Sequence, residues 1–268
     1  MNFAGLELAR RIEAAEAHNG AECAEAQQLL DPAVGATVRQ LAGGSAIFVG
    51  PGSPLTHAVG LGMGGPVRPE ELDRLEAFYR ARGATVSVDL CPLADASLLE
   101  LLGSRGYRTT EFMNVLIRPL TGPEIAQPEA PIRLANDGEE ELWARTVGRG
   151  FLEKDTLTAE EMDVGRNIFH MPGSLCYLAF AGNLAVAAGA MAMYGGVTTL
   201  FADSTTAGFR GIGLQSALIR ERLRAAPAAG LDNPCDLATA STLPGSVSQR
   251  NYERNGFQVA YTKTILVR

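Results

Sequence analysis

Lysine is almost absent from this sequence of 268 residues: of 23 basic residues only Lys154 and Lys263 are lysines, and the others are arginines. The sequence has no basic run that could neutralise a row of phosphates or of anionic lipid headgroups. Its 30 acidic residues give a formal net charge of -7 at pH 7. We therefore expect neither a nucleic acid nor a membrane as a partner.

Histidine and cysteine are also scarce, with three of the first and four of the second. None has the short spacing of a zinc site, so we expect no metal. Cys176 and Cys235 fall in predicted strands without a partner His or Asp, and we expect inert core thiols there. Glu and Arg interrupt the N-terminal segment where a signal peptide needs an apolar core, which predicts a cytoplasmic protein with free thiols.

Charge is missing altogether from Met171 to Ala202, a stretch long enough to span a bilayer. Its interior does not suit a membrane helix, because Ala-Gly-Asn at 181–183 and Gly-Gly at 195–196 divide it into three short pieces. The abundance of Gly and Ala also makes it poorly hydrophobic for a spanning helix. We predict three buried strands in a meander instead.

Proline is concentrated between the two halves of the chain. Four prolines within 119–131 predict a linker over 119–130, between a domain at 1–118 and a domain at 131–268. The last 18 residues of each domain align without a gap at an offset of 150, with Gly106 opposite Gly256. This alignment indicates a duplicated domain.

The spacing of apolar residues predicts a similar order of elements in both halves. In the second half we expect a strand at 132–134, helices at 138–148 and 158–169, strands at 175–180, 184–193 and 197–204, a helix at 211–225, a strand at 235–239, a helix at 246–254 and a strand at 257–267. In the first half we expect helices at 5–18, 69–82 and 95–104, and strands near 37–41, 45–49, 55–61, 84–90 and 107–117. Mixed sheets with crossover helices belong to the α/β (α+β) class.

One segment of the second half has the pattern of an anion-binding loop. A buried strand runs into Arg210-Gly211-Ile212-Gly213-Leu214-Gln215 and then directly into an amphipathic helix. The glycines let the backbone turn so that N–H groups at the helix N-terminus point at a phosphate, and the arginine adds a cation. The alternative is a plain turn with a surface arginine.

This segment resembles the acyl-CoA-binding motif of the GNAT acetyltransferase superfamily, Arg/Gln-x-x-Gly-x-Gly/Ala, although Gln215 stands where many members have a small residue. The resemblance implies two domains, each with a mixed, mostly antiparallel sheet flanked by helices, and acetyl-CoA as cosubstrate. It also implies a splayed strand at 203–205 whose open edge pairs with the pantetheine arm. The implied cofactor-binding residues are Ser204, Thr205, Arg210, Gly211, Ile212, Gly213, Leu214, Gln215, Ser216, Ser248 and Asn251.

A second segment, Gly245 to Phe257, resembles the C-terminal motif of the same superfamily, which ends in Tyr-x-x-x-Gly-Phe. The resemblance implies that Tyr252 protonates the departing CoA thiolate. A phenol has a pKa of about 10, so it is protonated at neutral pH and suited to donate to a sulfur anion. The alternative is a helix tyrosine that packs on the sheet.

Attack on a thioester needs a neutral amine, so the reaction also requires a residue that takes up the amine's proton. Asp203 is the first candidate, because it lies on the strand beside the expected thioester. Glu153 and Asp155, in the loop between the first two helices of the second half, come second. Surface charge or loop capping is the alternative for each acid. We expect the arginine-rich stretch 220–224 to be a solvated helix face, from which Arg220 or Arg224 can meet an adenosine 3′-phosphate.

The first half lacks two of these groups. At the offset of 150, Gly60 stands opposite Arg210 and Leu102 opposite Tyr252, although a glycine-rich turn remains at 60–65. We therefore expect a degenerate GNAT-like domain at 1–118 that packs on the catalytic half and bounds the acceptor site.

The sequence thus predicts an acetyl-CoA-dependent N-acetyltransferase in which a small-molecule amine attacks the thioester directly in a ternary complex. Three alternatives stay open: acetylation of a protein amine, a non-catalytic acyl-CoA-binding regulatory protein, and a scaffold without CoA affinity. The acidic net charge favours a cationic amine. The sequence leaves the identity of the acceptor and the oligomeric state open.

Overall fold

The structure is a computed structural model that describes residues 4–121, 125–128, 130–229 and 234–268. The chain divides into two compact units. Unit 1 comprises the described residues up to Val115 together with Thr242–Pro244 and Val259–Arg268, and unit 2 comprises those of Leu116–Ser241 and Gly245–Gln258. The predicted linker lies at the start of unit 2, and its residues 122–124 and 129 are outside the described residues.

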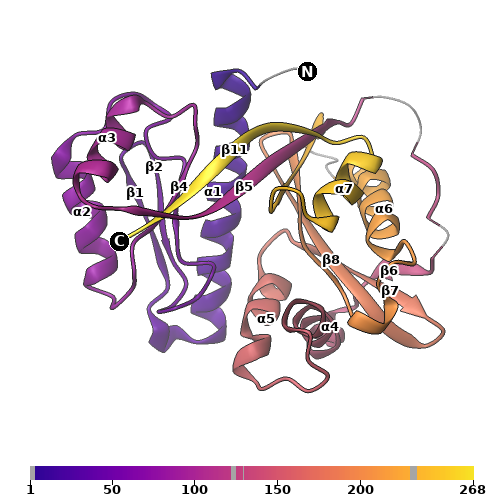
Figure 1. Cartoon of the computed structure of the whole chain (residues 1–268). Helices are drawn as coiled ribbons and strands as arrows, with labels where there is room; N and C mark the ends of the chain where they lie inside the picture. The colour runs from indigo at the N-terminus through magenta and orange to yellow at the C-terminus, as the bar shows by residue number, and fades with distance from the viewer. Residues whose placement is uncertain (1–3, 122–124, 129, 230–233) are drawn as a thin grey trace. The chain divides into compact units, whose positions relative to one another are not determined.

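Unit 1 is a mixed, mostly antiparallel sheet with helices on both faces (Figure 1). Its strands follow the order β1-β2-β3-β4-β11-β5. Strand β3 pairs with β4 in parallel, whereas β1 with β2, β2 with β3 and β4 with β11 pair in antiparallel fashion. Its elements are α1 (Leu6–Leu30), η1 (Pro32–Val34), β1 (Thr37–Leu41), β2 (Gly44–Phe48), β3 (Ala58–Val59), α2 (Pro69–Arg80), β4 (Ser87–Leu90), α3 (Ala96–Ser104), most of β5 (Arg108–Pro119) and most of β11 (Gln258–Val267).

Helix α1 is longer than predicted: the expected end at residue 18 is wrong, and the helix continues to Leu30. Asn19-Gly20 has the composition of a helix C-terminus. In the structure Gly20 is instead buried inside the helix, where a Cβ atom would lie 2.2 Å from Cδ1 of Ile47 on β2. The glycine therefore lets the helix pack closely on the sheet rather than ending it.

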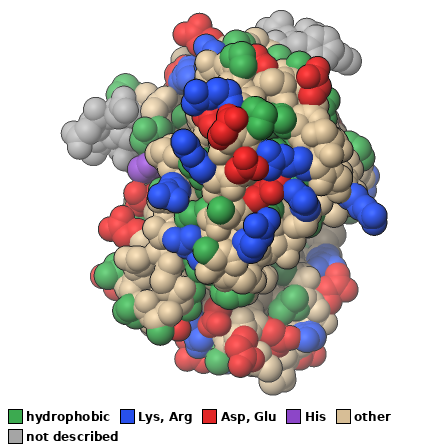
Figure 2. All heavy atoms as spheres, turned by 90° about the vertical axis from the view of Figure 1, so that its left-hand side faces the viewer, with side chains coloured by type: hydrophobic (Ala, Val, Ile, Leu, Met, Phe, Trp, Pro, Cys, Tyr) green, Lys and Arg blue, Asp and Glu red, His purple; other side chains and the backbone are tan. Residues whose placement is uncertain are grey.

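The two faces of the unit 1 sheet are covered differently. Helices α2 and α3 pack an apolar layer on one face, which includes Leu72, Leu75, Leu98 and Leu102. The outer surface of these helices carries paired charges, such as Arg105 with Asp73 at 2.6 Å. Figure 2 shows basic and acidic side chains interspersed on this side, without a large patch of one sign.

Helix α1 covers the other face with a buried cluster of charges. Lys263 on β11 is 1% exposed, and its Nζ lies 3.0 Å from Oε1 of Glu13 and 2.5 Å from Oε2 of Glu16. The Tyr261 hydroxyl donates to the same Oε1 of Glu13 at 2.7 Å. Burial by itself lowers the pKa of Lys263, but the two carboxylates more than reverse this effect and raise it above its ordinary value.

This cluster explains why the structure departs from the predicted domain boundary. The sequence assigns 131–268 to the second domain, whereas Val259–Arg268 belongs to unit 1. The buried ammonium of Lys263 needs a carboxylate partner, and α1 supplies two. The alignment of the two chain ends says which segments are alike, but it says nothing of which sheet each strand joins.

Unit 2 is also a mixed, mostly antiparallel sheet, with strand order β5-β10-β9-β8-β7-β6. One face carries α4 and α5, packed through Trp143, Val147 and Ile168, and the other carries α6 and α7 (Figure 1). Its elements are the end of β5, β6 (Ile132–Leu134), η2 (Asp137–Glu139), α4 (Glu140–Leu152), η3 (Glu160–Met162), α5 (Asp163–His170), β7 (Leu175–Ala181), β8 (Leu184–Tyr194), β9 (Val197–Thr205), η4 (Ala207–Phe209), α6 (Leu214–Ala229), β10 (Leu237–Thr242) and α7 (Val247–Arg254).

The uncharged stretch from 171 to 202 forms β7, β8 and most of β9, so the predicted meander is confirmed. Within the described part of the chain, no helix combines the length and the apolar character that crossing a membrane requires. The same residues contain no cluster of His, Cys, Asp and Glu suited to a metal ion. All four cysteines lie in the described part of the chain, are buried and form no disulfide bond.

We expect Lys263→Met to lower the free energy of unfolding by about 3–5 kcal/mol, because the variant leaves buried carboxylates without a cation. Urea denaturation measures the change. Lys154→Met is the matched control, since Lys154 is the other lysine, is 54% exposed and pairs with Glu161 on the surface. Its effect should stay within about 0.5 kcal/mol. Equal losses in the two variants would contradict the role of the buried cluster.

A second prediction concerns pH. His57 Nδ1 lies 3.2 Å from Oδ2 of Asp89. Burial opposes protonation of His57, but Asp89 outweighs it and raises the pKa of His57 above its ordinary value. The pair's contribution to stability is therefore complete below about pH 6.5 and is lost as the pH rises through the folded-state pKa.

Compared with His57→Gln, the wild type should accordingly lose melting temperature as the pH rises from about 6 to 8. Melting temperatures at several pH values measure this difference. His18→Gln serves as the control, because His18 is 36% exposed and its Nε2 lies 3.5 Å from Oε1 of Glu22 on the same helix. A pH-independent difference between wild type and His57→Gln would rule out the pair as its cause.

Candidate functional site

The two parallel strands of unit 2 separate after a short contact. Strands β9 and β10 pair at three positions, from Leu237 opposite Val197 to Thr239 opposite Thr199. Strand β9 continues to Thr205 and keeps its pairing with β8 on the other side. The splayed strand edge expected at 203–205 therefore lies beyond the paired part of β9 and β10.

A bulge follows the last pair of β9 with β10. Ala190 pairs with Phe201 and Ala188 with Ser204, so that two residues of β9 stand opposite the single residue Gly189 of β8. Ala202, one of these two, has a φ of 55°, which an L-amino acid rarely adopts. A bulge bends the strand that carries it, and this one directs the end of β9 toward the glycine loop.

The glycine loop forms the connection between β9 and α6. Gly211 and Gly213 have φ values of 80° and 87°, a backbone conformation that glycine adopts at little cost. Helix α6 begins directly afterwards at Leu214. The first N–H groups of a helix have no partner inside it and attract anions, and Ile212 in this loop is 66% exposed. The geometry suits a phosphate.

Arg210 makes different contacts from those that the motif suggests. Its guanidinium donates to the carbonyl of Gly150 at 2.7 Å and pairs with Oε1 of Glu153 at 2.6 Å. Its Nε donates to the carbonyl of Thr205 at 3.2 Å. The side chain thus ties the loop to the end of α4, and Glu153, a predicted proton acceptor, is its partner.

Two other predicted residues point away from the open edge or into solvent. Ser204 is buried, and its hydroxyl donates to the Val147 carbonyl of α4 at 2.8 Å, so this side chain serves packing. Asp155 pairs with Arg149 at 2.9 Å and is 98% exposed. At Ser204 only the backbone remains available to a ligand.

The two motifs meet through side chains on α6 and α7. The Gln215 amide donates to the Ser248 hydroxyl at 2.8 Å and accepts from the Asn251 amide at 2.7 Å. Ser216 accepts from Asn255 at 3.1 Å. The structure thus brings together Gln215, Ser248 and Asn251, three predicted cofactor residues from segments that are distant in sequence.

Tyr252 and Asp203, the two predicted catalytic residues, are also brought together. The Tyr252 hydroxyl donates to Oδ2 of Asp203, and Oδ1 of Asp203 pairs with Arg222 of α6. Tyr252 is 2% exposed and packs edge-on against Phe257, with ring centroids 4.9 Å apart. Burial raises the pKa of Tyr252 well above its ordinary value, and the charge of Asp203 raises it further.

Arg222 is the residue that sequence reasoning missed. The sequence predicts a solvated face at 220–224, but Arg222 has no exposed surface. The sequence does indicate this burial: Arg222 lies four residues after Leu218 and eight after Leu214, a spacing that places it on the apolar stripe of the helix. Of its neighbours, Arg224 is 38% exposed and pairs with Glu221 at 3.1 Å. Nε of Arg220 is buried without a hydrogen-bond partner among the described residues.

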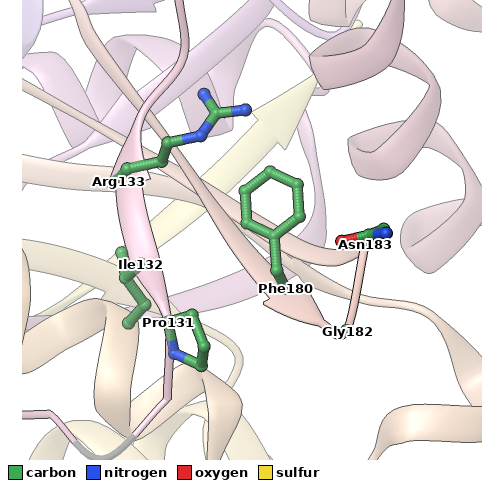
Figure 3. Close-up of a pocket in the computed structure, with 6 residues that line it drawn as sticks. All are labelled: Pro131, Ile132, Arg133, Phe180, Gly182 and Asn183. Atoms are coloured by element: carbon green, nitrogen blue, oxygen red, sulfur yellow. The ribbon is translucent and has the colours of Figure 1, made fainter.

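A pocket of about 400 Å³ lies elsewhere in unit 2, along the edge formed by β6 and the end of β7 (Figure 3). Arg133 and Phe180 both line it, with the guanidinium carbon 4.7 Å from the ring centroid. The guanidinium also binds Glu139, at 2.6 Å for its closest pair of atoms. This edge is three strands from β9 in the sheet and shares no lining residue with the predicted cofactor site.

Comparisons with known proteins concern the fold of the chain. No model of a protein family matches the chain, and no curated protein matches its sequence. Among solved structures, a GCN5-related N-acetyltransferase from Kribbella flavida has a TM-score of 0.67 and 19% identity, covering 97% of this chain and 95% of its own. One from Sphaerobacter thermophilus has a TM-score of 0.57 and 16% identity, covering 87% and 75%.

A third structure is a tandem GNAT protein from the clavulanic acid biosynthesis pathway. It has a TM-score of 0.56 and 13% identity, and the match covers 82% of this chain and 72% of its own. Identities this low establish similarity of fold and nothing more. The chain therefore has the fold seen in GCN5-related N-acetyltransferases, with a mixed α/β architecture in each unit.

Proposed function

We propose that the protein is an N-acetyltransferase that uses acetyl-CoA as cosubstrate and binds it in unit 2. The observation that carries the proposal is the separation of β9 from β10 immediately before a glycine loop and a helix N-terminus. In a fold that GNAT acetyltransferases share, this arrangement provides an open strand edge beside a cradle of N–H groups.

The residues of the loop suit a pyrophosphate. The positive φ angles at Gly211 and Gly213 let successive N–H groups point outward, and an added Cβ at either position would meet nothing within 4 Å among the described atoms. A ligand can therefore approach the backbone closely. Gln215, Ser248 and Asn251 add amide and hydroxyl donors beside the N-terminus of α6. The unpaired edge at the end of β9 would hold the pantetheine arm.

In the proposed reaction the amine nitrogen forms a bond to the thioester carbonyl carbon and the carbon–sulfur bond breaks. A backbone N–H on the open edge of β9 stabilises the oxyanion. The Tyr252 hydroxyl, which donates to Asp203 in the structure, turns to the sulfur and donates its proton there, and the proton that the amine loses balances it. The raised pKa of Tyr252 keeps the phenol protonated at neutral pH.

The structure changes the assignment that we propose for the amine's proton. Both oxygens of Asp203 are engaged, one by Arg222 and the other by the hydroxyl of Tyr252. We therefore propose that Asp203 holds these two groups, and that the proton passes to Glu153 or Asp155 on the α4–α5 loop. Each of these acids pairs with an arginine, but unlike Asp203 each is exposed to solvent, which can take the proton on. These exposed acids and the net charge of -7 also support a small cationic amine as acceptor.

We further propose that unit 1 is a degenerate copy that binds no acyl-CoA. Strand β3, helix α2 and strand β4 repeat the order of β9, α6 and β10, including the parallel pairing. The backbone of its glycine turn is already engaged, however. The N–H of Gly62 donates to the carbonyl of Ala42 at 2.9 Å, and the N–H of Met63 donates to the carbonyl of Gly60 at 3.5 Å. Such a turn offers few free donors to a phosphate.

We expect the wild type to bind one equivalent of acetyl-CoA per chain. The Ile212→Glu variant should bind acetyl-CoA at least about tenfold more weakly, because a carboxylate in the loop repels phosphate. Isothermal titration with acetyl-CoA measures both. Leu184→Glu is the control, since Leu184 at the start of β8 is 51% exposed and distant in sequence from the loop. Absence of binding refutes the proposed cofactor, and two equivalents refute the degenerate unit 1.

We expect Tyr252→Phe to lower kcat for acetylation of a cationic amine about 100-fold and to leave the affinity for acetyl-CoA within about threefold, because the variant lacks only the proton donor. Steady-state release of free CoA across a panel of diamines and amino sugars measures kcat. Unchanged kcat would remove Tyr252 from the mechanism. Wild-type binding without turnover on the panel would favour the regulatory acyl-CoA-binding protein, or a protein amine as acceptor.

A further inference from the structure

Arg222 is buried more completely than a helix-surface arginine should be. It has no exposed surface, and its Nη1 donates to the carbonyls of Ala190 on β8 at 2.7 Å and of Phe201 on β9 at 3.3 Å. Its Nε donates to Leu218 at 3.1 Å within α6, and its Nη2 pairs with Asp203. Burying such a pair adds little net stability compared with apolar side chains, so stability alone does not explain it.

The contacts of Arg222 coincide with the bulge. Ala190 and Phe201, whose carbonyls it binds, are the residue pair that borders the bulge on one side, and Asp203 lies inside it. Gly189 stands opposite. A Cβ atom there would lie 2.7 Å from Oδ1 of Asp203 and 3.0 Å from the guanidinium carbon, so the sheet leaves room for the ion pair only at a glycine.

Asp203 in turn sets the direction of the Tyr252 hydroxyl. The three side chains come from α6, β9 and α7, and each is at least nine-tenths buried. Tyr177 of β7 is the other titratable group that acts on Arg222 from the sheet, and burial raises its pKa to about 12, which leaves it neutral. Glu221, on α6 itself, is the titratable residue next to Arg222 in the sequence, and its side chain is 25% exposed.

We propose that Arg222 is a positioning residue for acyl transfer, which fixes the bulge of β9 and, through the carboxylate of Asp203, aims the hydroxyl of Tyr252. The catalytic part of this proposal rests on the proposed function. The coupling among Arg222, Asp203 and Tyr252 is independent of the proposed function. Two experiments test these parts separately.

The first experiment needs no ligand. In Asp203→Asn the cation of Arg222 faces the phenol without an intervening anion, so Tyr252 should ionise at lower pH than in the wild type. Alkaline titration, followed by tyrosinate absorbance, should show a gain of one tyrosine that ionises at a lower pH than in the wild type. The gain should disappear in Asp203→Asn/Tyr252→Phe and in Asp203→Asn/Arg222→Met. If Asp203→Asn gives the same titration curve as the wild type, the coupling among the three side chains is refuted.

The second experiment uses the pH dependence of kcat. A buried carboxylate that loses its cation takes up a proton at higher pH, so kcat of Arg222→Met should fall as the pH drops through the neutral range while that of the wild type stays level. We expect about a 30-fold loss at neutral pH and an affinity for CoA within about threefold. A uniform loss with an unchanged pH profile indicates a merely structural role and overturns the proposal.

Two further variants protect the test against misfolding. Arg222→Met/Asp203→Asn removes both charges together, so it leaves no unpaired buried ion, and its kcat should be low and independent of pH.

Gly189→Ala separates Asp203 from Arg222 with one methyl group, and it should reproduce the pH profile of kcat of Arg222→Met. Gly138→Ala is its control, since a Cβ there meets nothing within 4 Å among the described atoms. Wild-type behaviour in Gly189→Ala overturns the proposal.

The two failures are distinguishable. If acetyl-CoA does not bind the wild type, the proposed function fails, whereas the alkaline titration still decides whether Arg222, Asp203 and Tyr252 act as a unit. If acetyl-CoA binds and amines are acetylated but kcat of Arg222→Met keeps the wild-type pH profile, the proposed function stands and the positioning role fails.

Discussion

The separation of β9 from β10 is the constraint on which the rest of unit 2 depends. Parallel strands gain stability from each backbone pair, and these two give up pairing after Thr199 and Thr239. The unpaired backbone must then find other partners or a ligand. The bulge at Ala202 bends β9, the glycine loop follows it, and α6 begins where the loop ends. The candidate site therefore combines the early end of the β9–β10 pairing with the bulge and the glycine loop that follow it.

Both units bury a basic side chain between a helix and the sheet, but they use it differently. In unit 1, Lys263 of β11 holds the C-terminal strand against Glu13 and Glu16 of α1. In unit 2, Arg222 of α6 reaches two strand carbonyls and Asp203 at once. The planar guanidinium has five donors in a fixed fork, whereas an ammonium is a single point charge. The three donors of an ammonium sit on one nitrogen, whereas the guanidinium spreads its donors over three nitrogens, which suits acceptors on two strands and a carboxylate.

Most elements could be predicted from the sequence, because apolar periodicity and glycine positions reflect local constraints. The meander at 175–205, the loop at 210–213 and the helix that carries Tyr252 are examples. Three features required knowledge of distant partners. The length of α1 depends on Ile47 beneath Gly20, and the place of β11 depends on Glu13. The spacing of Arg222 indicates its place on the apolar stripe of α6, but its partner Asp203 could not be predicted from the sequence. Motif matching likewise located Arg210 without revealing its contact with Glu153.

The two glycine turns differ in the contacts of their backbones, and this difference underlies the proposal that only the loop of unit 2 binds a phosphate. Both turns follow a strand that pairs in parallel with the strand after the next helix. In unit 1 the turn is fastened by Ala42, Asp95 and Arg10, and α1 packs beneath it. In unit 2 the equivalent backbone leads straight into a helix N-terminus, and Arg210 fastens the loop from outside. Affinity for an anion therefore depends on which backbone donors the fold leaves unpaired, and the number of glycines does not decide it.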